Sequence, residues 1–118
     1  MHREPPSRVE LLQGTLDLLI LRTLLRGPTH GHAIAKHIQR RSEEMLQVET
    51  GSLYPGLHRL EAKGWIAASW KLSDKGKRAR YYQLTRLGLK QLASEQWKWR
   101  AFSRAVGLIL NPADQDGQ

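Results

Sequence analysis

The segment Gly14–Arg26 is apolar on nearly every side, which restricts the fold more than any other feature of the sequence. Its apolar side chains form one helical stripe and cover much of the remaining surface: Leu12, Leu16, Leu19 and Thr23 make the stripe, and Leu18, Leu21, Leu24 and Leu25 surround it. A helix of this kind has to be enclosed by other elements, as the central helix of a small bundle is. Gly27-Pro28 is predicted to end it. The 118 residues are enough for one small domain.

Two shorter helices are predicted to follow. Thr29 is the expected N-cap of a helix from His30 to about Ser42, and a polar connector leads to the next helix, Thr50 to Gly64. In that helix Leu53, Leu57 and Leu60 recur at i, i+4 and i+7, so they share one face. With Ser52 as its cap, Pro55 falls in the first turn and no helical hydrogen bond is lost.

A β-hairpin is predicted after Gly64. Apolar and polar residues alternate from Trp65 to Trp70, and Arg80 to Leu84 are rich in strand-favouring aromatics. The segment 73–78 has turn composition, with Gly76 available for a positive φ. The tip is basic, with only Asp74 to oppose five cations: Lys71, Lys75, Lys77, Arg78 and Arg80.

A final long helix is predicted from Arg86 to Leu110, capped by Thr85 and stopped by Asn111-Pro112. It carries two apolar stripes: one holds Leu89, Leu92, Trp99, Val106 and Leu110, and the other holds Ala93, Trp97, Ala101, Ala105 and Leu108. One stripe satisfies packing on its own domain, so two indicate a second partner, most simply the same helix of another copy. The first stripe is the predicted dimer interface.

The expected fold class is mainly α with a small β-hairpin. It comprises a winged helix-turn-helix domain over residues 11–85 and a dimerisation helix over residues 86–111. Residues 1–10 are expected to be a flexible arm, and residues 112–118 a disordered tail.

The formal net charge of +8 points to a polyanionic partner, nucleic acid in particular. A basic surface kept for solubility is the alternative. The predicted DNA-binding residues lie on the two short helices and at the hairpin tip: Thr50, Ser52, Tyr54, His58, Arg59, Lys36, Lys75, Lys77 and Arg78. Plainer interpretations exist. Thr50, Ser52 and Tyr54 could simply cap a core helix, and the basic residues of the hairpin tip could form a solvated turn.

Other classes of function find little support. Cysteine is absent, which excludes disulfides and thiolate chemistry. His30, His32 and His37 are interpreted as structural or solvated histidines, because no carboxylate accompanies them on one face. No nucleophile elbow or phosphate-binding glycine loop occurs, so we expect no catalysis, no metal and no cofactor. No apolar run is long enough to cross a bilayer, and a cytoplasmic protein is expected.

Trp97 and Trp99 point to nearly opposite sides of the last helix, because two residues correspond to about 200° of rotation. Either can be an ordinary core residue. One of them can instead form the aromatic wall of a pocket at the dimer interface that takes a flat apolar effector.

Several motifs together resemble PadR-like transcriptional regulators. They cover roughly residues 11–110: Gly51-Ser52-Leu53-Tyr54-Pro55, Leu57, Arg59-Leu60-Glu61, Gly64, Gly14-Thr15-Leu16-Asp17, Gly27-Pro28-Thr29-His30-Gly31, Trp70, Arg80-Tyr81-Tyr82-Gln83-Leu84-Thr85 and Gly88. The resemblance implies a winged-helix repressor that dimerises through its last helix. Members of the family are released from DNA by small aromatic compounds or respond to other cues. His32 departs from the pattern, since an aromatic residue is commoner at its position. The single C-terminal helix resembles the short-tailed branch of the family, in which a ligand cannot be assumed.

On this resemblance, Tyr54 and its neighbours meet the operator, Lys77 and Arg78 approach the adjacent groove, and Trp99 rather than Trp97 takes the position where relatives often carry a tryptophan. The sequence therefore predicts a homodimeric regulator of transcription that binds a pseudo-palindrome in duplex DNA. Two alternatives stay open. One is a ligand-sensing or partner-binding module that works through its dimer helix. The other is an RNA-binding module, although the stacking platforms expected for single strands are missing.

Overall fold

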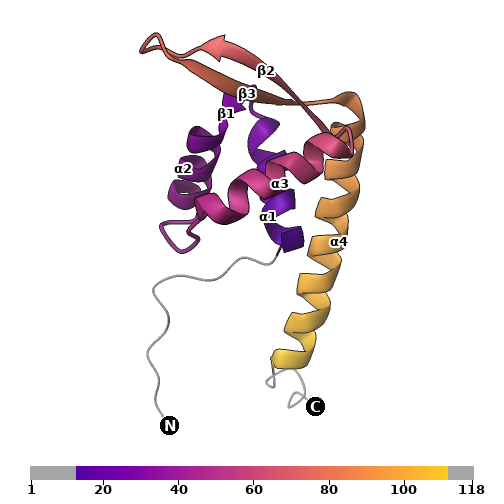
Figure 1. Cartoon of the computed structure of the whole chain (residues 1–118). Coiled ribbons are helices and arrows are strands. Elements are labelled where there is room, and N and C mark those ends of the chain that lie inside the picture. Colours follow the sequence, from indigo (N-terminus) through magenta and orange to yellow (C-terminus); the bar gives the residue numbers. More distant parts are fainter. Residues whose placement is uncertain (1–12, 112–118) are drawn as a thin grey trace.

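The first helix lies at the centre of the molecule, as predicted. In the computed structural model, which describes residues 13–111, helix α1 (Gln13–Leu24) contacts helices α2 (Gly31–Arg41), α3 (Thr50–Ala62) and α4 (Arg86–Leu110) (Figure 1). One apolar cluster joins all four helices to the sheet: Leu16, Ile20, Leu21, Leu24, Ile34, Ile38, Leu53, Leu57, Leu60, Ile66, Tyr82 and Leu92. The leucines of α3 that share one face are all in this cluster, so the opposite face of α3 is free for contacts outside the domain.

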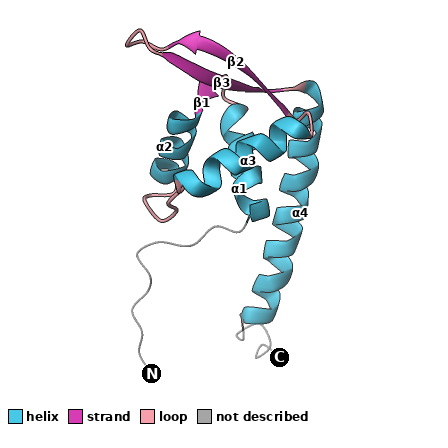
Figure 2. Ribbon diagram, viewed as in Figure 1, coloured by secondary structure: helices cyan, strands magenta, loops and turns pink. Residues whose placement is uncertain are grey.

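A small antiparallel sheet covers one end of the helices (Figure 2). Strands β2 (Ile66–Leu72) and β3 (Arg78–Leu84) form the predicted hairpin, with Ile66 opposite Leu84 and Leu72 opposite Arg78. The turn closes through a hydrogen bond of 2.7 Å from the Ser73 amide to the Lys77 carbonyl. Gly76 has a φ of +79°, as its place in the turn requires. We refer to this hairpin as the wing.

A third strand, β1 (Thr29–His30), was not predicted from the sequence. It pairs with β3 at Tyr82 and Tyr81, which makes β3 the middle strand. Because Thr29 is in this strand, its predicted role as the N-cap of α2 is wrong. His30 is the cap instead, and its ring Nδ1 accepts a hydrogen bond of 3.2 Å from the Ala33 amide.

The start of α3 also differs from the prediction. Glu49 is its N-cap and makes no side-chain capping bond, so the helix begins at Thr50 and Ser52 is not the cap. Pro55 therefore lies inside the helix, where it has no amide hydrogen to offer the carbonyl of Gly51. The chain enters α3 through an exposed, weakly capped end.

Helix α4 begins and ends where the sequence predicted. The Thr85 hydroxyl accepts from the Gly88 amide at 3.0 Å and donates to the Gly64 carbonyl at 2.7 Å, which fixes the first turn of α4 to the end of α3. The last turns of α4 extend past α1, and their apolar residues are exposed: Phe102, Leu108, Ile109 and Leu110. The predicted arm 1–10 and tail 112–118, and Leu12 of the first stripe, lie outside the described residues.

Candidate nucleic-acid interface

The amino-terminal end of α3 presents polar groups to solvent, because the leucines on its other face are buried in the core. Thr50 and Ser52 are exposed, and Tyr54 is half-exposed. The Tyr54 side chain lies against Gly31 at the start of α2, so closely that a Cβ atom on Gly31 would come within 2.9 Å of the phenol oxygen. Gly31 thus gives Tyr54 the space in which it bridges the two helices of the helix-turn-helix.

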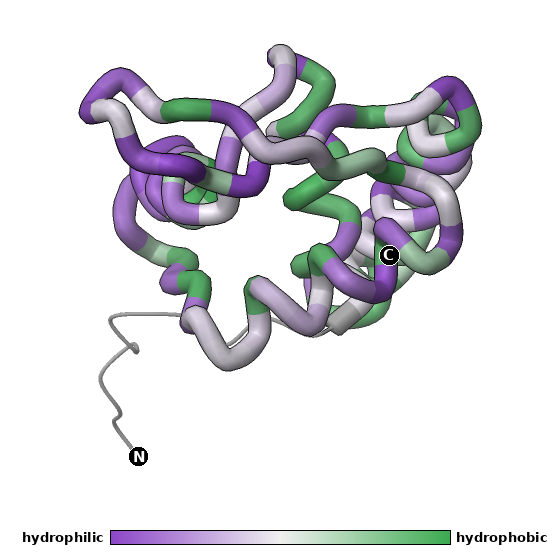
Figure 3. The backbone as a smooth tube through the Cα atoms, turned by 45° about the horizontal axis from the view of Figure 1, so that its top comes forward, coloured by the Kyte–Doolittle hydropathy of each residue, from purple (hydrophilic) through white to green (hydrophobic). Residues whose placement is uncertain are grey.

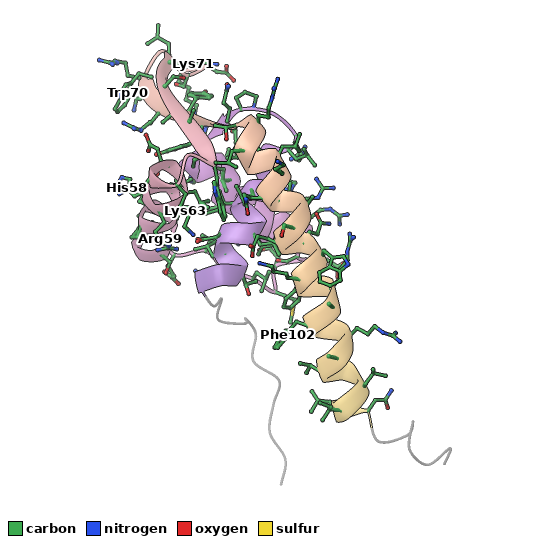
Figure 4. All side chains as sticks on the ribbon, turned by 90° about the vertical axis from the view of Figure 1, so that its right-hand side faces the viewer. His58, Arg59, Lys63, Trp70, Lys71 and Phe102 are labelled. Carbon is green, nitrogen blue, oxygen red and sulfur yellow. The ribbon has the colours of Figure 1, made fainter. Side chains whose placement is uncertain are left out.

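The wing carries cations held by aromatic rings. The Arg78 guanidinium lies 5.0 Å from the centre of the Trp70 ring, and the Lys71 ammonium lies 5.4 Å from the Tyr81 ring. Trp70 is itself exposed and projects from the same side of the molecule as His58 on α3 (Figure 4). Such contacts leave the positive charge free to meet an anion while they limit the motion of the side chain. Hydrophilic residues gather around the turn of the wing (Figure 3).

The wing and the helix-turn-helix enclose one groove of about 620 Å³. Tyr54, His30 and His32 line it from the helices, and Lys75, Lys77 and Arg78 line it from the wing. Tyr82 also lines the groove, and burial raises the pKa of its phenol, which therefore stays protonated. The structure therefore brings Tyr54 together with the three predicted wing cations, which are far apart in the sequence.

Arg80 differs from the other wing cations. Its guanidinium donates to the Glu61 carboxylate at 2.7 Å, so the expectation that Asp74 alone opposes the basic wing is wrong. This ion pair joins the return strand of the wing to α3. The hydrogen bond from the Thr85 hydroxyl to the Gly64 carbonyl is a second connection between the end of β3 and the end of α3.

Arg59, predicted to bind DNA, is half-buried and faces the core side of α3. Its Nη2 donates to Asp17 Oδ1 at 2.8 Å and its Nε to Oδ2 at 3.3 Å, which gives a two-point contact with α1. The partner of Arg59 is thus a carboxylate of the same chain. His58, the residue before Arg59, is exposed on α3, and Lys36 is exposed on α2 outside the groove.

Replacing Arg59 with methionine is expected to lower the free energy of unfolding by roughly 1–3 kcal/mol, because the nearly buried Asp17 carboxylate loses both hydrogen bonds. Urea denaturation measures the change. The double variant with Asp17→Asn should be less destabilised than the sum of the two single variants, since the two groups interact directly. Additive losses would show that the contact contributes nothing.

The two tryptophans of α4 lie on different sides, as their spacing predicted. Trp99 faces α1, where it lines a groove of about 330 Å³ together with Gly14, Leu18 and Phe102. Its ring contacts that of Phe102, with 6.4 Å between the centres. Trp97 is 70% exposed and lies outside this groove. Phe102 was missed from the sequence because it falls between the two stripes, although its spacing of three from Trp99 was a usable signal.

The predicted dimer residues do not all reach the surface. Leu89 and Leu110 are exposed and Val106 is half-buried, so they can contact a second copy. Leu92 is 3% exposed and packs in the core of its own chain, which makes its predicted place in the interface wrong. Phe102 and Ile109 are exposed apolar residues of α4 that the first stripe did not include.

Within residues 13–111, no group of three or more histidine or acidic side chains is arranged to hold a metal ion. No helix among these residues is long and apolar enough to span a membrane.

Comparison with known proteins agrees with this geometry. The family model described as the transcriptional regulator PadR-like family matches residues 20–94. A protein from Lysinibacillus sphaericus is 33% identical over 104 residues, which cover 87% of this chain and 94% of the relative. The structure of a PadR family transcriptional regulator from Eggerthella lenta is 32% identical, covers 84% of each chain and superposes with a TM-score of 0.71.

A transcriptional regulator from Clostridium thermocellum has a TM-score of 0.77 at 26% identity, over 84% of this chain and 96% of that one. The family match covers more than half of the residues and includes α2, α3 and the wing. The chain therefore belongs to the PadR-like family of transcriptional regulators, which are DNA-binding proteins and not enzymes.

Proposed function

We propose that this PadR-like regulator binds a pseudo-palindromic operator as a homodimer and represses transcription from it. The groove that gathers Tyr54 with Lys75, Lys77 and Arg78 carries the proposal. The start of α3 enters the major groove, where Thr50, Ser52 and Tyr54 meet base edges and phosphates, and the wing follows the neighbouring backbone. His58 and Lys36 extend the contact, and Arg59 stays with Asp17 and acts only by holding α3 in place.

The homodimer rests on α4. This long helix carries exposed or half-buried apolar side chains: Leu89, Trp99, Phe102, Val106 and Leu110. A second copy of the same helix would cover them. Two recognition helices related by a twofold axis read half-sites about 34–36 Å apart, one turn of the duplex. A dimer seated across two major grooves blocks a promoter, which is the reason for assigning repression, and it would act in the cytoplasm beside the DNA.

The experiment that tests this function is selection of bound sites from random duplex DNA, followed by gel-shift titration. We expect an inverted repeat with centres one helical turn apart. Tyr54→Ala should weaken binding to the selected site by about tenfold, because a contact of roughly 1–3 kcal/mol is lost. Lys63→Ala, an exposed cation at the other end of α3, is the matched control and should bind normally. Recovery of no consensus, or preference for duplex RNA in competition, would refute the assignment.

A second function is favoured by the groove at Trp99. A planar aromatic effector could stack on Trp99 and Phe102 against α1, which is the side of α4 proposed to meet the second copy. In DNA-free protein, such a compound should quench tryptophan fluorescence by bringing its ring onto Trp99. Quenching should disappear in Trp99→Phe and persist in Trp97→Phe. Equal quenching in both variants would place the compound elsewhere.

A further inference from the structure

Arg80 is the wing cation that forms an ion pair within residues 13–111. Its Nη2 donates to Glu61 Oε2 at 2.7 Å, and the Glu61 side chain comes from the last turn of α3. The remaining wing cations form no ion pair with these residues: Lys71, Lys75, Lys77 and Arg78. Glu61 therefore neutralises one cation of the wing and leaves the others available to an anion.

Arg80 and Arg78 lie beside the same aromatic ring. Arg80 is opposite Trp70 in the register of β2 and β3, and its guanidinium carbon lies 5.8 Å from the centre of the indole. The guanidinium carbon of Arg78 lies 5.0 Å from the same ring. Two guanidinium groups around one ring repel each other unless a negative charge balances one of them. Glu61 supplies that charge from the neighbouring helix.

The contact between Arg80 and Glu61 is a single-point contact. Arg59 binds Asp17 through two nitrogens, whereas Arg80 uses Nη2, and its buried Nε has no hydrogen-bond partner in the described part of the chain. The Arg80 side chain is 40% exposed, so water competes for this ion pair. Arg80 also lines the groove under the wing, as Arg78 does. Loss of the Glu61 charge would therefore release a cation at the proposed DNA surface.

We propose that Glu61 is a specificity-determining residue, which holds Arg80 away from DNA phosphates and so limits binding to DNA of any sequence. The inference rests on the proposed DNA-binding function of the groove. A released Arg80 would gain a phosphate contact on every duplex, because the phosphates are the same in all sequences. On the operator the ion pair has a second effect, since it joins the wing to α3 while α3 reads the bases. Its loss adds a contact on both kinds of DNA and costs wing placement on the operator alone.

Glu61→Gln in the full chain tests this inference. Glutamine is close to glutamate in size and can still accept from Arg80, so the fold should be retained, and urea unfolding verifies this. Near 0.1 M salt, the variant should bind a random-sequence duplex about fivefold more tightly. The slope of log affinity against log salt on that duplex should become steeper by up to about 0.9 for each protomer bound. Affinity for the selected operator should rise less, so the ratio of operator to random affinity should fall.

Glu95→Gln is the matched control for charge. Glu95 lies on α4 outside the groove, and its carboxylate is 3.6 Å from the Lys98 ammonium. The substitution removes the same charge from the chain and should leave both affinities unchanged. Adding Arg80→Gln to Glu61→Gln should return the salt slope on the random duplex to the wild-type value, because the released cation is no longer present.

Unchanged affinity and salt slope of Glu61→Gln on the random duplex would overturn the proposal. So would an equal gain in Glu95→Gln, or a gain that persists after Arg80 is also replaced, since neither would depend on Arg80. An equal gain on the operator and on random DNA would show that Glu61 has no effect on specificity. Weaker operator binding with no change on random DNA would mean that the ion pair only holds the wing.

The random-sequence duplex also separates this proposal from the proposed function. If site selection recovers no operator, the homodimeric operator reader is refuted, while the affinity and salt slope on random DNA still test whether Glu61 holds Arg80 away from phosphates. If an operator is recovered and Glu61→Gln leaves the ratio of affinities unchanged, the specificity role of Glu61 fails by itself.

Discussion

Gly88→Ala is expected to lower the free energy of unfolding by roughly 3 kcal/mol, the upper end of overpacking effects. A Cβ atom on Gly88 would lie only 1.9 Å from the Trp65 carbonyl oxygen and 2.8 Å from its carbon. That carbonyl cannot move freely, because it accepts from the Thr85 amide at 3.1 Å while the Thr85 hydroxyl bonds to Gly64. To make room for the added methyl group, α4 would have to move away from Trp65, which directly precedes β2. That movement would break both Thr85 hydrogen bonds. Thermal and urea unfolding measure the loss.

Gly107→Ala is the matched control within the same helix. Apart from its chain neighbours and the backbone of its own helix, no described atom lies within 4 Å of the Cβ position of Gly107. Because glycine destabilises the interior of a helix relative to alanine, Gly107→Ala should raise the free energy of unfolding by roughly 0.5–1 kcal/mol. The two variants should therefore shift stability in opposite directions, and a similar loss in both would contradict the role given to the Gly88 contact.

Replacing Lys77 and Arg78 together with alanine is expected to weaken operator binding on the order of a hundredfold near 0.1 M salt. Both side chains line the groove beside Tyr54, and Arg78 is held outward by Trp70. A dimer would lose four cations, so the slope of log affinity against log salt should fall by up to about 3.6. Fluorescence anisotropy at several salt concentrations measures both quantities.

Lys90→Ala with Arg104→Ala is the control for charge, because it removes the same net charge from exposed positions on α4. Its affinity and salt slope should stay near the wild-type values. If both double variants weaken binding equally, overall charge and not the wing accounts for the effect. Loss of affinity with an unchanged slope in the wing variant would indicate that Lys77 and Arg78 contact bases or the fold, and not phosphates.

The sequence predicted best what local signals specify. Thr85 and Asn111-Pro112 mark the two ends of α4 through capping and the properties of proline, and the structure places the helix between them. The hairpin could be predicted equally well, because the alternation of apolar and polar residues and the glycine at position 76 are local signals. The wing cations and Tyr54 were identified by residue type alone, and only the fold shows that they share one groove.

What was missed depends on distant partners. β1 has two residues and forms only because β3 lies beside it, so no propensity could indicate it. Arg59 looks free on a helical wheel, yet its partner Asp17 is 42 residues away. Leu92 belongs to an apolar stripe that looks continuous, and its burial follows from the packing of α4 on its own domain, including α1. These three cases need tertiary structure.

Only Thr85 separates β3 from α4, so a rotation of the last helix would be passed directly to the wing. With 25 residues, α4 is about 37 Å long, at about 1.5 Å per residue. If two copies pair along α4, a change of roughly 10° in their crossing angle would displace each wing by about 6 Å, given that length. The duplex tolerates little error in half-site separation, so an effector at Trp99 would need only a small rotation to release the operator.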